Sequence, residues 1–272
     1  MKALTPDIHE LSLGIVNVWL LRDGDGWALI DTGAPNNAGE ILNAALILGF
    51  QPEQLRHIVL THHHADHAGS LAALRLRTPA DATAHPLDAD LIRRGTAVRP
   101  TLKPGPSALG RVLVRLFGAS GSAPYEPGIV EGEANDGDLL PIAGGLRVIH
   151  TPGHSAGHIA LLAERQGVLF AGDACANMLG LGPSIVYEDA AEGMGSLARL
   201  ATLDFEAVCF GHGRAITREA VGRFRRRWAA LSGPGPGLAG GRFRGEPGAG
   251  CGDPVFPAEI GDLTGDGSAR VT

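Results

Sequence analysis

The feature that most constrains this chain is a histidine-rich segment at residues 61–69, Thr-His-His-His-Ala-Asp-His-Ala-Gly, which follows a β-type apolar run. Side chains alternate along a strand, so we expect His62 and His64 to point to one side, and a turn into a helix can bring Asp66 and His67 to the same place. Two imidazoles favour one metal ion, and a carboxylate with a third imidazole favours a second ion beside it. These ligand types suit zinc, iron, manganese or cobalt. The simpler interpretation is a run of histidines on an exposed turn that binds metal by chance.

Three later segments place further ligand-type side chains where an apolar strand meets a glycine-containing turn. They are Thr-Pro-Gly-His-Ser-Ala-Gly-His at 151–158, Phe-Ala-Gly-Asp at 170–173 and Phe-Gly-His-Gly at 210–213. At such strand ends a rigid sheet can present side chains to a shared cleft. The ordered set of motifs resembles the metallo-β-lactamase-fold hydrolase superfamily, which includes glyoxalase II, lactonases, ribonuclease Z-type enzymes and zinc β-lactamases. The resemblance covers about residues 8–230.

The resemblance implies an α/β (α+β) fold, a four-layer αβ/βα metallo-β-lactamase sandwich of two mixed sheets flanked by helices. The hydrophobic periodicity fits this plan. The expected strands are at residues 15–21, 27–30, 57–61, 82–85, 138–142, 146–150, 158–163, 168–171 and 207–210, and the expected helices are at about 36–48, 69–77, 107–117, 188–203 and 217–231.

The resemblance also implies a binuclear ligand set. One metal would be held by three histidines, the second by one aspartate and two histidines, and a further aspartate would bridge them. In that order the residues are His62, His64 and His154; Asp66, His67 and His212; and Asp173. Two adjacent cations lower the pKa of a shared water, so the expected nucleophile is a metal-bridging hydroxide. Asp66 would steer this hydroxide or receive a proton. The implied cofactors are two divalent ions, zinc ahead of iron or manganese.

Two residues are expected to support the ligands. In the superfamily the Asp-Thr-Gly turn at 31–33 lies under the metals, so Asp31 would orient ligands through hydrogen bonds. An ordinary turn aspartate that bonds to nearby amides explains it equally well. His158 is the best supporting histidine, with a satisfied turn histidine as an equal alternative.

The substrate pocket is expected to include the loop after Asp173. Its sequence, Met-Leu-Gly-Leu-Gly-Pro at 178–183, is mostly apolar and suits an acyl group better than a phosphate. We expect Met178 and Leu179 in the pocket, and Tyr187 either reaches it from the following loop or only packs.

Length and composition fit one enzyme domain followed by an extension. The chain has 272 residues, of which 44% are hydrophobic and 19% charged, enough for a substantial core. We expect a hydrolase domain at 1–232 and a flexible tail rich in glycine and proline at 233–272. A helical insertion at 95–128 would be a lid over the cleft, a surface decoration or a dimer contact. A homodimer is therefore one of the alternatives that the sequence allows.

Charge and cysteine usage narrow the expected partners and compartment. The net charge of −6 argues against sequence-independent nucleic-acid binding, which draws on a basic surface. The longest apolar runs are strand-sized, so no membrane partner is expected, and the first residues lack the form of a signal peptide. The three cysteines are widely spread, which makes disulfides unexpected and a cytoplasmic location the default.

The expected function is binuclear metal-dependent hydrolysis of an ester, thioester or lactone bond in a small molecule. Zinc β-lactamases generally lack the bridging aspartate, and acyl-homoserine lactonases often carry a tyrosine soon after it, where this chain has Ala-Cys-Ala-Asn at 174–177. The alternatives are a phosphodiesterase, a mononuclear iron oxidoreductase similar to persulfide dioxygenases, and a catalytically silent metal-binding protein.

Overall fold

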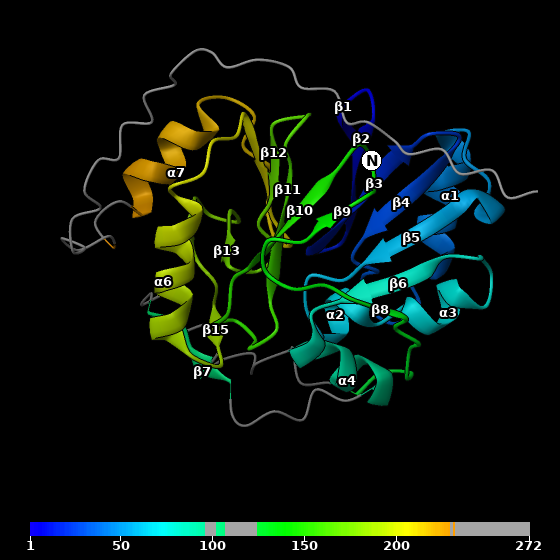
Figure 1. Cartoon of the computed structure of the whole chain (residues 1–272), viewed down its shortest axis with the longest axis horizontal. Helices are drawn as coiled ribbons and strands as arrows, with labels where there is room; N and C mark the ends of the chain where they lie inside the picture. The colour runs from blue at the N-terminus through cyan, green and yellow to red at the C-terminus, as the bar shows by residue number, and fades with distance from the viewer. Residues whose placement is uncertain (96–101, 107–123, 229–230, 232–272) are drawn as a thin grey trace, which may run out of the picture. The chain divides into compact units, whose positions relative to one another are not determined.

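The computed structural model describes residues 1–95, 102–106, 124–228 and 231 (Figure 1). Within the unit formed by residues 1–233, two large β-sheets face each other and helices cover their outer faces. Both sheets contain parallel and antiparallel pairs. The predicted four-layer αβ/βα sandwich of two mixed sheets is therefore confirmed.

The first sheet has seven strands, and their order in space follows their order in the chain. They are β1 (Lys2–Thr5), β2 (Ile8–Leu13), β3 (Val16–Asp23), β4 (Gly26–Ile30), β5 (Leu55–Val59), β6 (Asp81–Ala84) and β8 (Gly132–Glu133). The first four strands pair antiparallel through turns, and the last three join in parallel. Parallel neighbours need crossover connections, which contain α1 (Ala38–Ile47), η1 (Pro52–Gln54), α2 (Ala65–Ala68), α3 (Leu71–Arg75) and α4 (Pro86–Arg94).

The second sheet has five strands in the order β16-β12-β11-β10-β9. Their bounds are β9 (Leu139–Leu140), β10 (Leu146–His150), β11 (Ile159–Ala163), β12 (Val168–Phe170) and β16 (Ala207–Cys209). Helices α6 (Ala190–Leu200) and α7 (Ala220–Trp228) contribute to the core on its outer face. Two short pairs lie nearby, β13 (Cys175–Ala176) with β14 (Gly182–Pro183) and β15 (Val186–Tyr187) with β7 (Lys103–Pro104).

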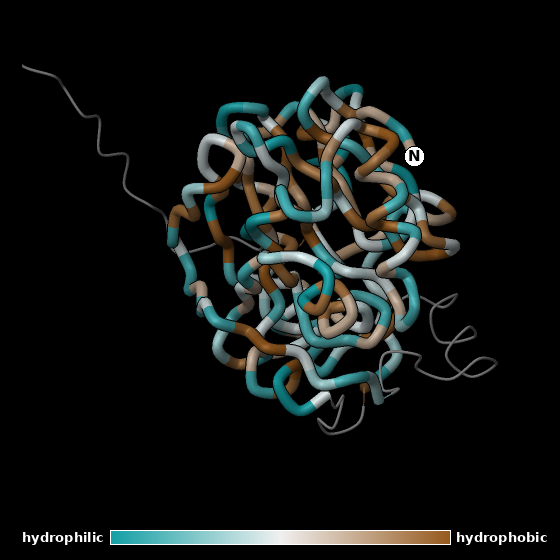
Figure 2. The backbone as a smooth tube through the Cα atoms, turned by 90° about the vertical axis from the view of Figure 1, so that its right-hand side faces the viewer, coloured by the Kyte–Doolittle hydropathy of each residue, from teal (hydrophilic) through white to brown (hydrophobic). Residues whose placement is uncertain are grey.

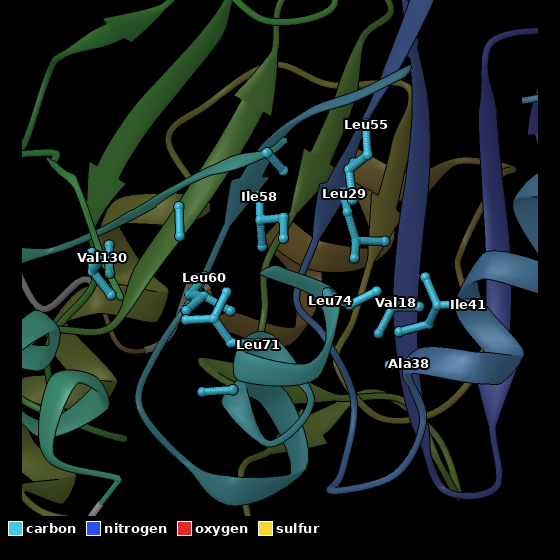
Figure 3. Close-up of a cluster of buried hydrophobic side chains, with 14 of the residues drawn as sticks. Val18, Leu29, Ala38, Ile41, Leu55, Ile58, Leu60, Leu71, Leu74 and Val130 are labelled. Atoms are coloured by element: carbon cyan, nitrogen blue, oxygen red, sulfur yellow. The ribbon is translucent and has the colours of Figure 1, made fainter. Parts of the chain in front are cut away.

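Strand β3 is apolar on both faces because both faces are covered. Val18 and Leu20 belong to the core between the first sheet and its helices, part of which is shown in Figure 3. Trp19 and Leu21 point the other way, into the core between the two sheets. There the ring of Trp19 meets Phe170 of β12 edge-on, with centroids 5.6 Å apart. Because successive side chains of β3 point to opposite faces of the sheet, this one strand contributes to both cores.

The hydropathy of the residues changes over short distances along the chain. Hydrophobic and hydrophilic stretches alternate along the tube in Figure 2. Among the helices that the structure describes, none is long and apolar enough to cross a membrane.

Several boundaries differ from the sequence expectations. The strand predicted at 57–61 ends at Val59, so His62 and His64 lie in a loop, while Asp66 and His67 lie in α2. The helix predicted at 69–77 is the shorter α3, and the unpredicted one-turn helix α2 precedes it, with Gly69 and Ser70 between the two. The β1–β2 hairpin and α4 have no counterpart in the prediction, because their sequences are short and mixed in polarity. The predicted helix at 107–117 and the tail at 233–272 lie outside the described residues.

Candidate metal centre

The predicted ligand residues follow the carboxyl ends of four strands. The histidine-rich loop follows β5, His154 follows β10, Asp173 follows β12 and His212 follows β16. Strands β10, β12 and β16 run in the same direction, since β10 and β12 are both antiparallel to β11 and β16 is parallel to β12. Their carboxyl ends therefore share one edge of the sheet, where the loop from the first sheet joins them.

A first cluster consists of three buried histidines, His62, His64 and His154. His62 Nε2 lies 3.1 Å from His64 Nδ1, and His154 Nε2 lies 3.2 Å and 2.9 Å from these two atoms. Nitrogens that share a tetrahedral zinc ion at 2.0–2.1 Å are about 3.3 Å apart. The observed spacing is close to this value.

A second cluster consists of Asp66, His67 and His212. His212 Nε2 lies 3.3 Å from Asp66 Oδ2 and 3.4 Å from His67 Nε2. Asp173 lies between the clusters, with Oδ2 at 3.2 Å from His212 Nε2 and 3.6 Å from His154 Nε2. Its Oδ1 lies 3.5 Å from His67 Nε2. One carboxylate thus reaches both groups.

Hydrogen bonds outside the clusters orient three of the imidazoles. In each ring Nδ1 faces an oxygen: Val186 O for His154 (2.9 Å), Asp31 Oδ2 for His67 (2.9 Å) and Ile15 O for His212 (2.8 Å). These oxygens can only accept, so Nδ1 carries the proton. Whenever the ring is neutral, Nε2 then presents its lone pair to the centre.

Thr61 orients His62 in the same sense. The single hydroxyl proton of Thr61 faces Asp31, at 2.8 Å from Oδ2 and 3.0 Å from Oδ1. The hydroxyl oxygen, 3.0 Å from His62 Nδ1, must therefore accept a hydrogen bond from the Nδ1–H of that ring. His62 Nε2 is left as an acceptor that faces the acceptor Nε2 of His154.

The two clusters differ in protonation. Burial, reinforced by neighbouring histidines, lowers the pKa of His62 and of His64 well below its usual value, so both rings are neutral near pH 7. Burial also lowers the pKa of His67, but the carboxylates of Asp173, Asp31 and Asp66 outweigh it and raise that pKa to about 9. The pKa of His212 is raised well above its usual value against the effect of burial, chiefly by Asp173.

The residues fit divalent metal ions. Within the described part of the chain no group donates a hydrogen bond to the buried Oδ1 of Asp173, and the acceptor Nε2 atoms of His62 and His154 lie 3.2 Å apart. A cation satisfies both conditions. In the second cluster a metal ion would replace the protons that the carboxylates otherwise attract to the two histidines.

Asp31 and His158 both contact the ligands or their backbone. Asp31 accepts from the Thr61 amide at 2.7 Å in addition to the contacts above. Nε2 of His158 accepts from the Asp173 amide at 2.9 Å, and its Nδ1 donates to Thr151 Oγ1 at 2.7 Å. Burial lowers the pKa of His158 to about 3, which keeps this acceptor available.

Sequence reasoning missed two polar residues that hold ligand loops. The side-chain amide of Asn17 donates to the carbonyls of Phe210 and Gly213, on either side of His212, at 3.2 and 2.7 Å. Thr32 donates through its hydroxyl to the carbonyl of His67 at 2.7 Å. The available signal was Asn17 itself, a polar residue within an apolar strand.

Gly211 is required by close approach. A Cβ atom at this position would collide with Oδ1 of Asp173 and with the ring of His67. The glycine before His212 therefore allows β16 to end directly against two ligand-type side chains.

A cavity opens over the two clusters. Its polar lining is His64, Asp66, His154, Asp173, Ser184 and His212, and its apolar lining is Ile15, Ala176, Met178, Ile185 and Val186. Of the predicted pocket residues, Met178 lines this cavity. The side chain of Leu179 is 84% exposed and outside the lining. Tyr187 is buried behind the wall, where its hydroxyl donates to Ala174 O and accepts from the Ser184 amide.

Comparisons with known proteins agree with this geometry. The profile of the metallo-beta-lactamase superfamily matches residues 11–212. The chain is 28% identical to the Bacillus subtilis protein named "Probable metallo-hydrolase YflN" over 77% of this chain and 85% of that protein. It is 31% identical to a hydroxyacylglutathione hydrolase of Xanthomonas axonopodis pv. citri over 75% of this chain, and spans 63% of that relative's length.

A solved structure shares the architecture. A metallo-beta-lactamase family protein from Thermus thermophilus aligns with a TM-score of 0.63 and 27% identity, covering 84% of this chain and 80% of that one. The profile match spans most of the chain and includes every cluster residue described above. The chain therefore belongs to the metallo-β-lactamase superfamily.

Proposed function

We propose that this protein is a binuclear metal-dependent hydrolase that cleaves carboxylic ester, thioester or lactone bonds in small molecules. The observation that carries the proposal is the pair of ligand clusters joined by Asp173 at the floor of a largely apolar cavity. Relatives named as a metallo-hydrolase and as a hydroxyacylglutathione hydrolase support hydrolytic chemistry.

In this proposal the first metal binds His62, His64 and His154, the second binds Asp66, His67 and His212, and Asp173 binds both. Zinc is the proposed ion, with iron or manganese as alternatives. Two bound divalent ions would supply Lewis acidity and lower the pKa of a bound water.

Asp66 would act as a ligand and as an orienting anion. It lines the cavity, and its carboxylate lies 3.3 Å from His212 Nε2. Burial raises the pKa of Asp66, but His67 and His212 outweigh that effect and bring it well below the usual value. A carboxylate that stays ionised so strongly is better suited to hold a cation or a polarised water than to store a proton.

The cavity lining favours a neutral acyl substrate over a phosphodiester. Ile15, Met178 and Ile185 supply apolar walls, and among the described residues no lysine or arginine lines the cavity. The proposed metal ions would attract a phosphate as well, but protein sites for phosphate groups generally add such side-chain cations or several backbone amides for the remaining oxygens. An acyl group needs only apolar contact beyond the reacting carbonyl.

Elemental analysis combined with a substrate panel tests this proposal. Protein purified without added metal should contain about two divalent ions per chain and should turn over thioesters or lactones faster than bis-nitrophenyl phosphate. About one iron per chain with little hydrolysis would instead favour the oxidoreductase. No turnover across the panel would favour a silent metal-binding protein.

The variant Asp66→Ala should lose the second metal and more activity than the roughly 10–100-fold typical of residues that only support ligands. The matched control is Asp25→Ala, which removes an exposed carboxylate from the β3–β4 turn. Full activity and a normal metal content in Asp66→Ala would refute the ligand assignment.

A further inference from the structure

Asp88 of α4 is a buried carboxylate that the proposed chemistry does not use. Its Oδ2 accepts from the amide of His63 at 3.0 Å, from the Nδ1 of the same histidine at 2.9 Å and from the Ser155 hydroxyl at 2.6 Å. Its Oδ1 accepts from the Gly157 amide at 2.9 Å. The side chains of His63 and Asp88 are 1% and 0% exposed.

The partners of Asp88 lie next to proposed ligands in the chain. His63 stands between His62 and His64, and Ser155 directly follows His154. The first of these loops follows β5 of one sheet, and the second follows β10 of the other. One carboxylate therefore joins the two proposed ligand loops, in addition to the backbone hydrogen bond from Ile159 N, directly after the second loop, to Thr61 O at 2.9 Å.

The His63 peptide is held on both sides. Its amide and ring bond to Asp88, and its carbonyl accepts from the Tyr125 hydroxyl at 2.6 Å. The Nδ1 of His63 is therefore engaged by Asp88, and the ring belongs to neither candidate cluster. With this residue fixed, the backbone directions from which His62 and His64 project are fixed as well.

A glycine in the loop after β10 allows α4 to lie close to that loop. A Cβ at position 157 would collide with the Asp88 carboxylate and would lie 2.6 Å from the Asp88 amide. Gly157 therefore removes the side chain that would hold the helix away from the loop. A charge buried this deeply is tolerated only where hydrogen bonds or a partner charge compensate its desolvation, and the two proposed ligand loops supply four such donors.

We propose that Asp88 is a positioning residue that sets the separation of His154 from His62 and His64, and thereby the affinity and geometry of the first metal site. This inference rests on the proposed function only in requiring that these histidines bind a metal. Asp88 touches neither metal nor substrate and acts through the two loops.

The variant Asp88→Asn tests the idea because it keeps the size of the side chain but replaces one accepting oxygen with an NH2 group. In a Co²⁺ titration against a chelator, one of the two binding steps should weaken by about 10–100-fold, the range for residues that support ligands. The visible absorption spectrum of the bound Co²⁺ should change at the same time. A side chain that only stabilises the fold would lower the urea midpoint and leave both metal readouts unchanged.

The matched control is Asp136→Asn. Asp136 accepts from the amide of His150, at the end of β10, and pairs with Arg199 on the surface, so it holds the same strand without joining the two loops. Its Co²⁺ affinity and spectrum should match those of the unmodified protein. Equal weakening in both variants would overturn the inference.

Ser155→Ala provides an independent test if Asp88→Asn does not fold. It removes one donor to Asp88 and should weaken the same step several-fold with a smaller spectral change. If the folded Asp88→Asn variant binds Co²⁺ with the affinity and absorption spectrum of the unmodified protein, the inference is overturned. The same result in Ser155→Ala overturns it where Asp88→Asn does not fold. If the unmodified protein binds no Co²⁺, the proposed function itself fails, which is a different outcome.

Discussion

At the scale of single residues, Asp31 shows how one side chain orients several residues of the candidate metal centre. Its carboxylate accepts from the amide and hydroxyl of Thr61 and from Nδ1 of His67. Through Thr61 it also determines which nitrogen of His62 carries the proton. Its backbone has φ of 61°, a left-handed conformation that aspartate and asparagine tolerate better than most residues.

The variant Asp31→Asn should therefore retain the backbone conformation but lose an acceptor. Either Thr61 or His67 then faces an NH2 group, and we expect metal affinity to fall by about 10–100-fold. The free energy of unfolding should fall by about 1–3 kcal/mol, because a buried donor is left without a partner. Chelator competition and urea unfolding measure the two effects.

Asp25→Asn, on an exposed turn, is the control for Asp31→Asn and should change neither quantity. Unchanged metal affinity in Asp31→Asn would show that Asp31 is an ordinary turn residue, the alternative that the sequence left open.

At the scale of elements, helix α7 packs against the second sheet at a distance in the structure from the candidate metal centre, so we expect it to affect stability and not metal binding. Helix α7 contacts the outer core through Phe224 and Trp228, and Phe224 meets Phe205 edge-on at 5.6 Å. The basic residues on the other side of the helix, such as Arg223, are exposed. None of these side chains lines the cavity over the metal centre.

The variant Phe224→Ala should lower the free energy of unfolding by about 3–5 kcal/mol, because it removes a fully buried aromatic side chain. Urea denaturation of the metal-loaded protein measures this loss. Metal affinity at temperatures where the variant remains folded should be unchanged. Arg223→Ala on the exposed face should stay within about 0.5 kcal/mol of the original stability. A small loss in Phe224→Ala would mean that α7 contributes little to the core.

At the scale of the whole described unit, residues from both sheets form two neighbouring clusters whose histidines have pKa values shifted in opposite directions. The first cluster holds neutral histidines, while the second holds histidines that neighbouring carboxylates favour in the charged form. Metal binding and protonation therefore compete mainly in the second cluster.

This competition predicts opposite pH dependences for the metal-free and metal-loaded protein. The pKa of His67 rises from 6.5 to about 9 on folding, so its proton stabilises the metal-free fold below pH 6.5 and this contribution is lost as the pH rises through about 9. We expect the free energy of unfolding in excess chelator to fall between pH 6.5 and 9. With excess zinc it should rise over the same interval, because fewer protons compete with the metal.

Urea unfolding at several pH values with chelator or with zinc makes the comparison. His62 and His64, whose pKa values are lowered, are neutral in the folded chain, and their unfolded forms lose most of their protons within about one pH unit above 6.5, so they add little slope at higher pH. Parallel curves under the two conditions would contradict the prediction.

Much of this unit could be predicted from local sequence patterns. Strands at 146–150 and 168–171 and the helix at 188–203 appear close to their expected positions, as β10, β12 and α6. Alternation in the buried strands and the 3.6-residue period of helices depend only on neighbouring residues. The β1–β2 hairpin was missed because pairing with β3, rather than an apolar pattern of its own, maintains it.

The sequence by itself determined the residue types of the candidate metal centre and the order of the strands that carry them, because these are properties of residue identity and local periodicity. Only the tertiary structure decided which polar residues orient the ligands. Asn17 bonds to a carbonyl 196 positions away, and Asp88 joins His63 to Ser155 across separations of 25 and 67 residues. Such contacts follow from the packing of two sheets and a helix, and no local pattern encodes them.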